Sequence, residues 1–453
     1  MSIGIVGGGP TGILTATLLA STGKSVKLFQ KGNLGGNHRV DWVGPLSTQF
    51  ARVYSNGYVN YIEILRYLEI DFYEYYERGD PYIVFKVMKD MPLGPLEIVT
   101  MLNYYVYTLV LPDRCKRISM KCISSNFKQK SKIFIDQMCK ILDGVGFERL
   151  SCWSFFSILN VIHTQYHPSK SSDVLWNKIL DKFKEFNGEI VPENVSKIVD
   201  FGIQTTGGTN WYFSKIVLCT PPKATLEIMR NSTSLIRDAI MPLDELEIYT
   251  FKSSYPVWIQ FTIHFNHHVK MKKPDFHDLL GKEWCILSLV LSDHIKTKGT
   301  LITCCTSTLD KISETGLIAN EIENSDVLLR EASRQVLKRF SISEEPDNVV
   351  LNPKVTRENG RWMTNDIPFV FSYETSAVTA KTDKKNLFWV GQQNGHGTFG
   401  VTTLETVSEN VIPFCLQISP TLEISKKGRY TFSRLIVFLM LLFFYLYTLY
   451  KSK

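Results

Sequence analysis

The chain has 453 residues, of which 44% are hydrophobic and 21% charged, so it is long enough for two or three domains and able to bury a core. This composition excludes a disordered or collagen-like chain, and nine cysteines without a CxxC pair indicate reduced thiols and not a disulfide or zinc framework. The net charge is +7, but residues 421–453 hold six bases against Glu423 alone, so the nearly neutral body lacks the basic footprint of a nucleic-acid-binding protein.

The N-terminal residues predict a strand, a helix and a second strand. Residues 3–6 form a short apolar run, residues 11–21 are typical of a helix, and residues 25–29 form the next strand. This β-α-β order is the start of a doubly wound sheet. Because a strand begins at residue 3, no signal peptide is expected.

The turn between the first strand and the helix has the sequence GGGPTG. It places Gly7, Gly9 and Gly12 in the spacing GxGxxG, in the strand-turn-helix context that dinucleotide binding requires. Gly7 permits the tight turn, Gly9 lets the backbone approach a diphosphate, and Gly12 lets helix and strand pack closely. The position that reads the ribose, at the end of the second strand, is Gln30.

The middle of the chain is less regular. The apolar run 98–111 predicts a core or interfacial helix, because 14 residues are too few to span a bilayer. A second αβ block comes next, with a helix over 175–186 and strands over 189–191, 196–201, 211–213 and 216–219.

Two further strands are predicted in the second half of the chain. Residues 257–265 alternate, with one apolar face for the core and Gln260 and His264 on the other face. Residues 387–390 form the last strand, which leads through a glycine-rich turn into a helix that begins near Thr402.

The C-terminal segment 435–450 is a 16-residue apolar run between Arg434 and Lys451. At 1.5 Å per residue it reaches roughly 24 Å, which suits a thin bilayer with Tyr and Lys at the interfaces. We expect a tail anchor on a membrane with the body facing the cytosol; a buried core helix is the alternative.

Four segments resemble the flavin amine oxidase superfamily, which includes monoamine and polyamine oxidases, protoporphyrinogen oxidase and phytoene desaturases. They are the opening IGIVGGGPTG, LGG at 34–36, IVLCTPP at 216–222 and LFWVGQQNGHGTFGVTTLETV at 387–407. The resemblance implies an α/β fold with a Rossmann-type FAD/NAD(P)-binding domain and an inserted α+β substrate domain. It also implies FAD, which is expected to be non-covalent because the closing motif contains no cysteine.

The resemblance assigns residues to this cofactor. The first turn would hold the diphosphate, Gln30 the ribose and the Val195 backbone the adenine, while the closing motif would meet the ribityl chain and the flavin ring. The residues so assigned are Gly7, Gly9, Thr11, Gly12, Gln30, Gly35, Gly36, Val195, Gly391, Gln392, Gly400, Val401 and Thr402.

Three positions depart from the pattern that the superfamily usually shows. Gln30 stands in place of Glu, Asn37 in place of Arg, and Gln392 in place of an acid. Gln accepts hydrogen bonds with its oxygen only, so a looser grip on the ribose is expected. The departures favour one alternative, a catalytically inactive flavin-fold binding protein similar to the Rab GDP-dissociation inhibitors. A non-redox flavin isomerase of the UDP-galactopyranose mutase kind is a third possibility.

The substrate side carries weaker signals. By resemblance, Gln260 aligns with the lysine that holds a water against the flavin in amine oxidases, which favours a dehydrogenase, desaturase or isomerase over an oxygen-consuming oxidase. His264, Trp362 and Tyr373 complete the candidate substrate pocket. The alternatives are a solvated or hydrogen-bonded strand face for Gln260 and His264, and core positions for the aromatic residues. No metal site is expected, because the histidines at 264–268 have no matching carboxylate or thiolate partner.

Together these patterns predict an FAD-dependent oxidoreductase that takes a hydride from a small amine or an apolar, membrane-resident substrate. Its expected partners are a small-molecule substrate and, through the C-terminal helix, the lipid bilayer, with no nucleic acid. The expected FAD-binding domain comprises residues 1–57, 170–240 and 385–420, the substrate domain 58–169 and 241–384, the basic linker 421–434 and the transmembrane anchor 435–450.

Overall fold

A computed structural model provides the three-dimensional structure. It describes residues 1–49, 52–79, 91–162, 165–200, 202–272, 283–365, 370–395, 397, 403–428 and, of the C-terminal segment, 439, 442, 443 and 445–447.

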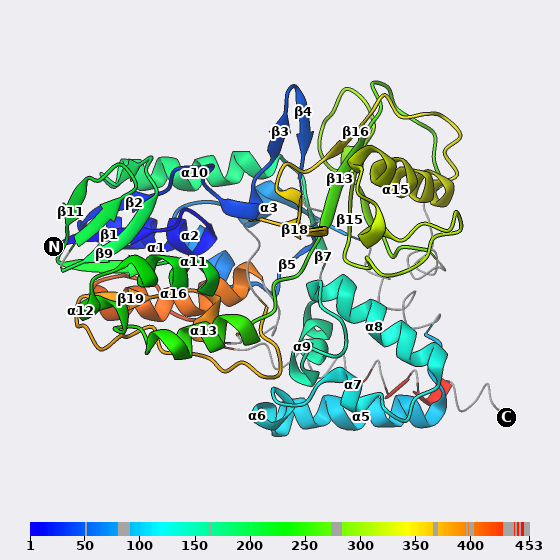
Figure 1. The fold of residues 1–453 in the computed structure, drawn as a ribbon, viewed down its shortest axis with the longest axis horizontal. Helices are drawn as coiled ribbons and strands as arrows, with labels where there is room; N and C mark the ends of the chain where they lie inside the picture. The colour runs from blue at the N-terminus through cyan, green and yellow to red at the C-terminus, as the bar shows by residue number, and fades with distance from the viewer. Residues whose placement is uncertain are drawn as a thin grey trace.

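A parallel sheet of five strands organises the part of the molecule that contains the N-terminus (Figure 1). Its strands, in order across the sheet, are β19 (Leu387–Trp389), β12 (Lys215–Leu218), β1 (Ser2–Val6), β2 (Ser25–Phe29) and β8 (Glu189–Val191). Val6 at the end of β1 lies beside Phe29 of β2 and Leu218 of β12. Because the strands are parallel, their carboxyl ends meet at one edge of the sheet.

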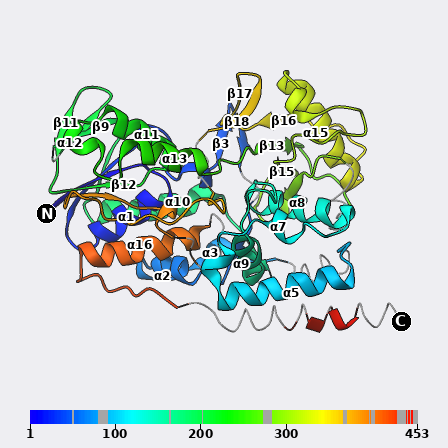
Figure 2. The same cartoon turned by 60° about the horizontal axis from the view of Figure 1, so that its bottom comes forward.

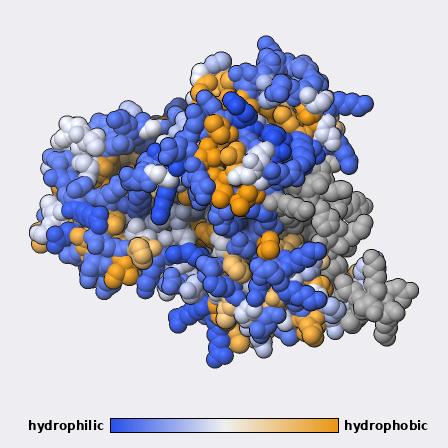
Figure 3. Space-filling model, turned by 45° about the vertical axis from the view of Figure 1, so that its right-hand side comes forward, coloured by the Kyte–Doolittle hydropathy of each residue, from blue (hydrophilic) through white to orange (hydrophobic). Residues whose placement is uncertain are grey.

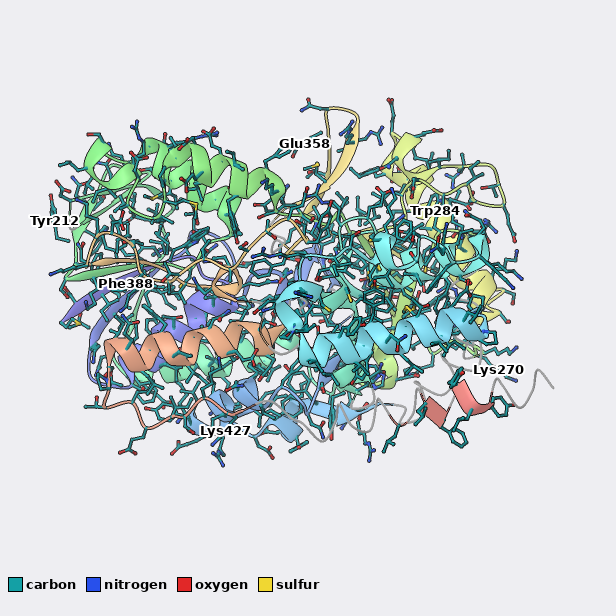
Figure 4. The ribbon with its side chains drawn as sticks, turned by 90° about the horizontal axis from the view of Figure 1, so that it is seen from below. Tyr212, Lys270, Trp284, Glu358, Phe388 and Lys427 are labelled. Carbon is teal, nitrogen blue, oxygen red and sulfur yellow. The ribbon has the colours of Figure 1, made fainter. Side chains whose placement is uncertain are left out.

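Both faces of this sheet are apolar and covered, as a parallel sheet requires. Ile5 belongs to a core with helices α1, α2, α10 and α16, whereas its neighbour Val6 belongs to a core with α11, α13 and a small antiparallel sheet. On the α16 side, Phe388 of β19 packs against Phe414 at 5.4 Å between ring centroids; Figure 4 labels Phe388. The bounds are α1 (Pro10–Ala20), α2 (Val59–Tyr67), α10 (Ser172–Glu185), α16 (Leu404–Ile418), α11 (Pro222–Asn231), α13 (Leu243–Lys252), β9 (Val195–Val199), β10 (Gly202–Thr205) and β11 (Asn210–Tyr212).

A second, antiparallel sheet lies on the other side of the molecule (Figure 1). It has the order β14 (Leu287–Val290), β15 (Leu301–Thr306), β13 (Ile259–His264) and β16 (Asn348–Leu351). Helix α15 (Ser325–Phe340) shares a core with Phe261 and its apolar neighbours on one face of β13.

The other face of β13 packs against the hairpin of β3 (Asp41–Val43) and β4 (Leu46–Thr48). The Thr262 hydroxyl donates to the Thr48 hydroxyl over 3.2 Å, and His264 Nε2 lies 2.9 Å from the carbonyl oxygen of Ser47. All six residues of β13 are buried, so the alternative of a solvated strand face is wrong here.

A group of helices forms the remaining part of the molecule (Figure 2). It comprises α5 (Pro95–Val110), α6 (Pro112–Cys115), α7 (Met120–Ile123), α8 (Gln129–Asp143) and α9 (Cys152–Ile162). Helix α5 corresponds to the helix predicted over 98–111; it buries Ile98 and Tyr105 and exposes Leu96 and Val110. The face of the molecule drawn in Figure 3 is mainly hydrophilic, with separate apolar patches.

Shorter elements connect these parts. They are β5 (Tyr54–Ser55), α3 (Phe72–Tyr75), β6 (Tyr76–Arg78), β7 (Gln165–Pro168), α12 (Ser234–Arg237), β17 (Val355–Glu358), β18 (Arg361–Thr364) and four 3-10 turns, η1 (Gly36–His38), η2 (Leu291–Asp293), η3 (Ala319–Glu321) and η4 (Gln392–Asn394).

The prediction of a transmembrane helix over 435–450 is wrong for the described part of the chain. Within it, no helix combines the length and the apolar character needed to cross a bilayer. The predicted run was already short, since roughly 24 Å of helix falls below the ~30 Å hydrocarbon core. The Rossmann-type α/β fold is supported, whereas no helix of the described residues supports the predicted anchor, the membrane localisation or the bilayer partner.

Candidate cofactor site

A cavity of about 900 Å³ lies at the carboxyl edge of the parallel sheet. Segments that follow its strands line the cavity: Gly7 to Gly9 after β1, Gln30 after β2, Glu193 and Asn194 after β8, Thr220 after β12 and Gly391 after β19. Val195, the first residue of β9, lines it as well. Its volume is within the range of small-molecule and cofactor sites. In open α/β sheets, ligands bind in the crevice outside the carboxyl ends of the strands.

Glycine occupies each of three positions in the first turn for a different structural reason. Gly7 has φ +104°, and a Cβ there would lie 2.9 Å from the carbonyl oxygen of Cys219. A Cβ on Gly12 would lie 1.8 Å from the carbonyl oxygen of Gly7, so only glycine lets α1 start this close to β1. A Cβ on Gly9 would meet no atom within 4 Å, so this position is open to a ligand.

Helix α1 begins at this turn with Gly9 as its N-cap and without a side-chain cap. The first backbone N–H groups of a helix have no intrahelical acceptor, and the helix dipole favours negative charge beside them. The turn from Gly7 to Thr11 therefore fits a diphosphate.

Two neighbouring segments fix the position of Gly8. The side-chain oxygen of Gln30 accepts a hydrogen bond from the Gly8 N–H over 2.8 Å, and the Gly35 N–H donates to the Gly8 carbonyl over 2.7 Å. The oxygen of Gln30 thus already holds the turn with one hydrogen bond, and the side-chain NH₂ can offer a ligand donors only.

Asparagines that the sequence analysis did not single out hold the closing segment. Asn394 Oδ1 accepts from the Gly391 N–H over 2.8 Å, and Asn394 Nδ2 donates to the carbonyl of Trp389 over 2.9 Å. Asn410 Nδ2 donates to the carbonyl of Gly391 over 3.0 Å. The sequence signal was the asparagine that ends GQQN, directly after the last strand.

The structure brings most of the assigned cofactor residues to this one cavity. Gly12 and Gly35 support the turn from behind without lining the cavity, and Gly400, Val401 and Thr402 lie outside the described residues. The lining residues among those assigned are Gly7, Gly9, Thr11, Gln30, Gly36, Val195, Gly391 and Gln392.

The four candidate substrate residues do not line this cavity. His264 contacts Ser47, and burial lowers its pKa below the ordinary value. Trp362 is buried in the core beside α15 and donates its indole N–H to the carbonyl of Ala319 over 3.1 Å. The backbone N–H of Tyr373 donates to the Arg149 carbonyl, and Gln260 is buried with no partner for Nε2 among the described residues.

Polar residues that the sequence does not predict also line the cavity, among them His38, Asp41 and Lys354. Asp41 Oδ2 lies 3.0 Å from Lys354 Nζ and accepts from Asn352 Nδ2 over 3.0 Å. Burial, and then the charges of Arg52 and Lys354, hold the pKa of His38 well below its usual value. The ring is therefore neutral at physiological pH. The sequence contains no signal for these contacts, which join residues about 300 positions apart.

Comparisons with known proteins agree with this geometry. Residues 5–40 match the family model of the NAD(P)-binding Rossmann-like domain. Wild-type putrescine oxidase bound to putrescine superposes with a TM-score of 0.64 at 11% identity, covering 92% of this chain and 99% of the oxidase. Cyclohexylamine oxidase from Brevibacterium oxydans gives 0.61 at 10% identity, covering 92% and 99%.

An oxidoreductase from Methanosarcina mazei also superposes, with a TM-score of 0.61 at 14% identity and coverage of 91% of this chain and 99% of that chain. The chain has a flavin amine oxidase-like fold. At these identities the likeness shows the fold alone, and no curated protein matches the sequence. The flavin amine oxidase-like fold confirms the predicted resemblance, and its dinucleotide-binding part is consistent with non-covalent FAD.

Proposed function

We propose that this protein is an oxidoreductase that holds FAD without a covalent bond and oxidises a small amine. The observation that carries the proposal is that the glycine-rich turn, Gln30, Val195 and the closing segment at Gly391 all line one cavity at the carboxyl edge of the parallel sheet. A dinucleotide fits such a cavity, because its diphosphate binds at a helix N-terminus and its two halves extend along the edge of the sheet.

Each part of the cavity has a role in this proposal. The turn from Gly7 to Thr11 binds the diphosphate, Gln30 and Val195 bind the adenosine half, and Gly391 and Gln392 orient the remaining half. When bound, FAD supplies the hydride acceptor. The chain contributes position and orientation, which suffice for a large share of catalysis when a reacting bond is held in line.

The amine is proposed from two structural neighbours, a putrescine oxidase bound to putrescine and a cyclohexylamine oxidase. Residues 58–169 and 241–384 would hold the substrate, while residues 1–57, 170–240 and 385–420 hold FAD.

The test is the visible absorbance of the purified full-length protein, before and after anaerobic addition of primary amines such as putrescine and cyclohexylamine. We expect a flavin spectrum that bleaches with at least one amine. Acid should then release the flavin into solution, because the link is non-covalent. A colourless protein that takes up no added FAD would contradict the proposal.

A second candidate is a flavin-fold binding protein without turnover. One observation favours it: Gln260, aligned with the lysine of amine oxidases, is buried away from the cavity, with Nε2 unpartnered among the described residues. Flavin that stays bound but is bleached by none of the amines, in the same experiment, would support this candidate.

A further inference from the structure

Two cationic side chains from distant parts of the chain meet the turn at residues 36 and 37. Lys354 Nζ lies 3.3 Å from the carbonyl oxygen of Gly36, and Arg52 Nη2 lies 3.4 Å from that of Asn37. The turn itself carries no charge, because Asn37 is neutral. Lys354, unlike Arg52, also lines the cavity.

The turn at Gly36 lies directly against the glycine-rich turn. A Cβ built on Gly36 would be 3.4 Å from the Cα of Gly9 and 3.6 Å from the ring of Pro10. The Gly35 N–H donates to the Gly8 carbonyl over 2.7 Å, so the two turns are joined by a hydrogen bond. A cation at Gly36 is therefore adjacent to the N-terminus of α1, where an anion is favoured.

Lys354 is held in this place by its neighbours. It lies shortly after β16, its backbone N–H donates to Asn352 Oδ1 over 2.9 Å, and its ammonium lies 3.0 Å from Asp41 Oδ2. The side chains of Lys354 and Asp41 are 17% and 8% exposed, so the pair is largely withdrawn from solvent and little screened by salt. The ammonium has three donors, and Asp41 and Gly36 use two of them.

The charge of the cavity makes this lysine important for an anionic ligand. Among the described residues that line it, Lys354 is the one permanent cation, against Asp41, Glu193 and Glu227. A diphosphate would therefore meet a wall with more acidic than basic side chains. A helix dipole contributes typically 0.3–1 kcal/mol, whereas a hydrogen bond to a charged group contributes about 1.5–3 kcal/mol, so a full positive charge near the turn would strengthen the binding of a diphosphate.

We propose that Lys354, positioned by Asp41, is the side-chain cation that binds the diphosphate of the dinucleotide, in place of a basic residue at Asn37. The proposal rests on the proposed function, because it takes the cavity as a dinucleotide site. It assigns Lys354 to the diphosphate and not to the flavin ring or the adenosine. It predicts that ligands with a diphosphate depend on Lys354 and that ligands without one do not.

The test compares Lys354→Gln with Lys354→Arg and with the control Lys385→Gln, which removes the same charge at an exposed site before β19. Flavin-stripped full-length protein is titrated by calorimetry with FAD, ADP and riboflavin. For Lys354→Gln we expect FAD and ADP to bind about 10- to 100-fold more weakly, as for loss of a charged hydrogen bond, and riboflavin to bind as before. Lys354→Arg should retain most of the FAD and ADP affinity, and Lys385→Gln all of it.

Each other outcome overturns the proposal. Unchanged ADP binding in Lys354→Gln would make the Lys354–Asp41 pair purely structural, and an equal loss for riboflavin would place Lys354 at the flavin. If the wild type binds none of the three ligands, the proposed function itself fails. Failure of the Lys354 assignment alone is distinguishable, because the wild type then still binds FAD.

A second variant is informative if Lys354→Gln does not fold. Asp41→Asn keeps Lys354 but removes the carboxylate that positions its ammonium, so it should bind ADP more weakly than the wild type and riboflavin equally well. Unchanged or tighter ADP binding in folded Asp41→Asn would contradict the proposal.

Discussion

The side-chain oxygen of Gln30 lies 2.8 Å from the backbone nitrogen of Gly8, so the end of β2 directly fixes the glycine-rich turn at the end of β1. Gln30, which is expected to bind a ribose, thus also stabilises the conformation of the turn. The hydrogen bond uses the one acceptor atom of this side chain. A carboxylate at residue 30 would keep this bond and offer a second acceptor oxygen.

We therefore expect Gln30→Glu to bind FAD about 3- to 10-fold more tightly, since a hydrogen bond to a charged group is stronger than one to a neutral group by about 1 kcal/mol. Gln30→Ala should weaken FAD binding and lower stability by about 1 kcal/mol, because the Gly8 N–H loses its acceptor. Calorimetric titration with FAD measures both binding effects, and urea unfolding measures the stability. A Gln30→Glu variant that binds FAD no better than the wild type would show that residue 30 does not face the ribose.

Gly9 and Gly12 provide a matched pair of alanine substitutions. A Cβ at Gly12 would collide with the Gly7 carbonyl at 1.8 Å, whereas a Cβ at Gly9 meets open space, and Gly9 has an ordinary φ of −74°. Gly12→Ala should lower the free energy of unfolding by about 3 kcal/mol or more. Gly9→Ala should leave it within about 0.5 kcal/mol.

FAD affinity should separate the two variants as well, because Gly9→Ala acts on the ligand and not on stability. Gly9→Ala places a methyl group where the diphosphate approaches, so FAD affinity should fall at least about tenfold while urea unfolding is unchanged. A Gly9→Ala variant with wild-type affinity would mean that no ligand approaches this turn.

Asn394 is expected to position the closing segment. Its side chain accepts from the Gly391 N–H and donates to the carbonyl of Trp389, so Asn394→Ala leaves both groups without these partners. We expect a loss of about 1–3 kcal/mol in urea unfolding and weaker FAD binding, because Gly391 and Gln392 line the cavity. The control is Asn320→Ala at an exposed site, which should change neither quantity. An Asn394→Ala variant of normal stability and affinity would contradict this role.

Glu405 predicts a pH dependence of stability. It is fully buried in α16, it accepts the backbone N–H groups of Asn60 and Tyr61 at the start of α2, and Glu409 lies nearby. Burial, followed by the charge of Glu409, raises its pKa to about 7. The folded state therefore binds this proton more tightly than the unfolded state does, and stability falls as pH rises from about 4.5 to about 7.

Glu405→Gln has no ionisable group at this position, so comparing it with the wild type gives the contribution of Glu405 to the pH dependence of the free energy of unfolding. Between pH 5 and pH 8 the wild type should lose on the order of 2–3 kcal/mol more stability than the variant does, at about 1.4 kcal/mol per pKa unit. Urea unfolding of both proteins at the two pH values gives the difference. Equal losses in the two proteins would show that the Glu405 pKa is not raised.

Local pattern was enough to predict the elements of the parallel sheet. The predicted strand 189–191 and the strands near 3–6, 25–29 and 387–390 agree with β8, β1, β2 and β19 within a residue or two. Each is a short apolar run between turn residues, and the glycine spacing predicted the tight turn between β1 and α1.

Local sequence patterns do not predict contacts between residues far apart in the chain. The alternation of 257–265 identified a strand and its apolar face, but the hairpin that covers the other face lies more than 200 residues earlier. The same holds for Lys354 and Asp41, whose partnership depends on how β16 meets β3. The span predicted over 435–450 rests on hydropathy, which alone does not distinguish a membrane span from other apolar segments, and no helix of the described residues supports it.

The central claim is that the turn at residues 7–12 and the closing segment at 391–395 bind one molecule of FAD together. Amide hydrogen exchange of the full-length protein, with and without FAD, tests this most directly. We expect slower exchange in both segments on addition of FAD, in the wild type and not in Gly9→Ala. Protection of only one segment, or of neither, would contradict it.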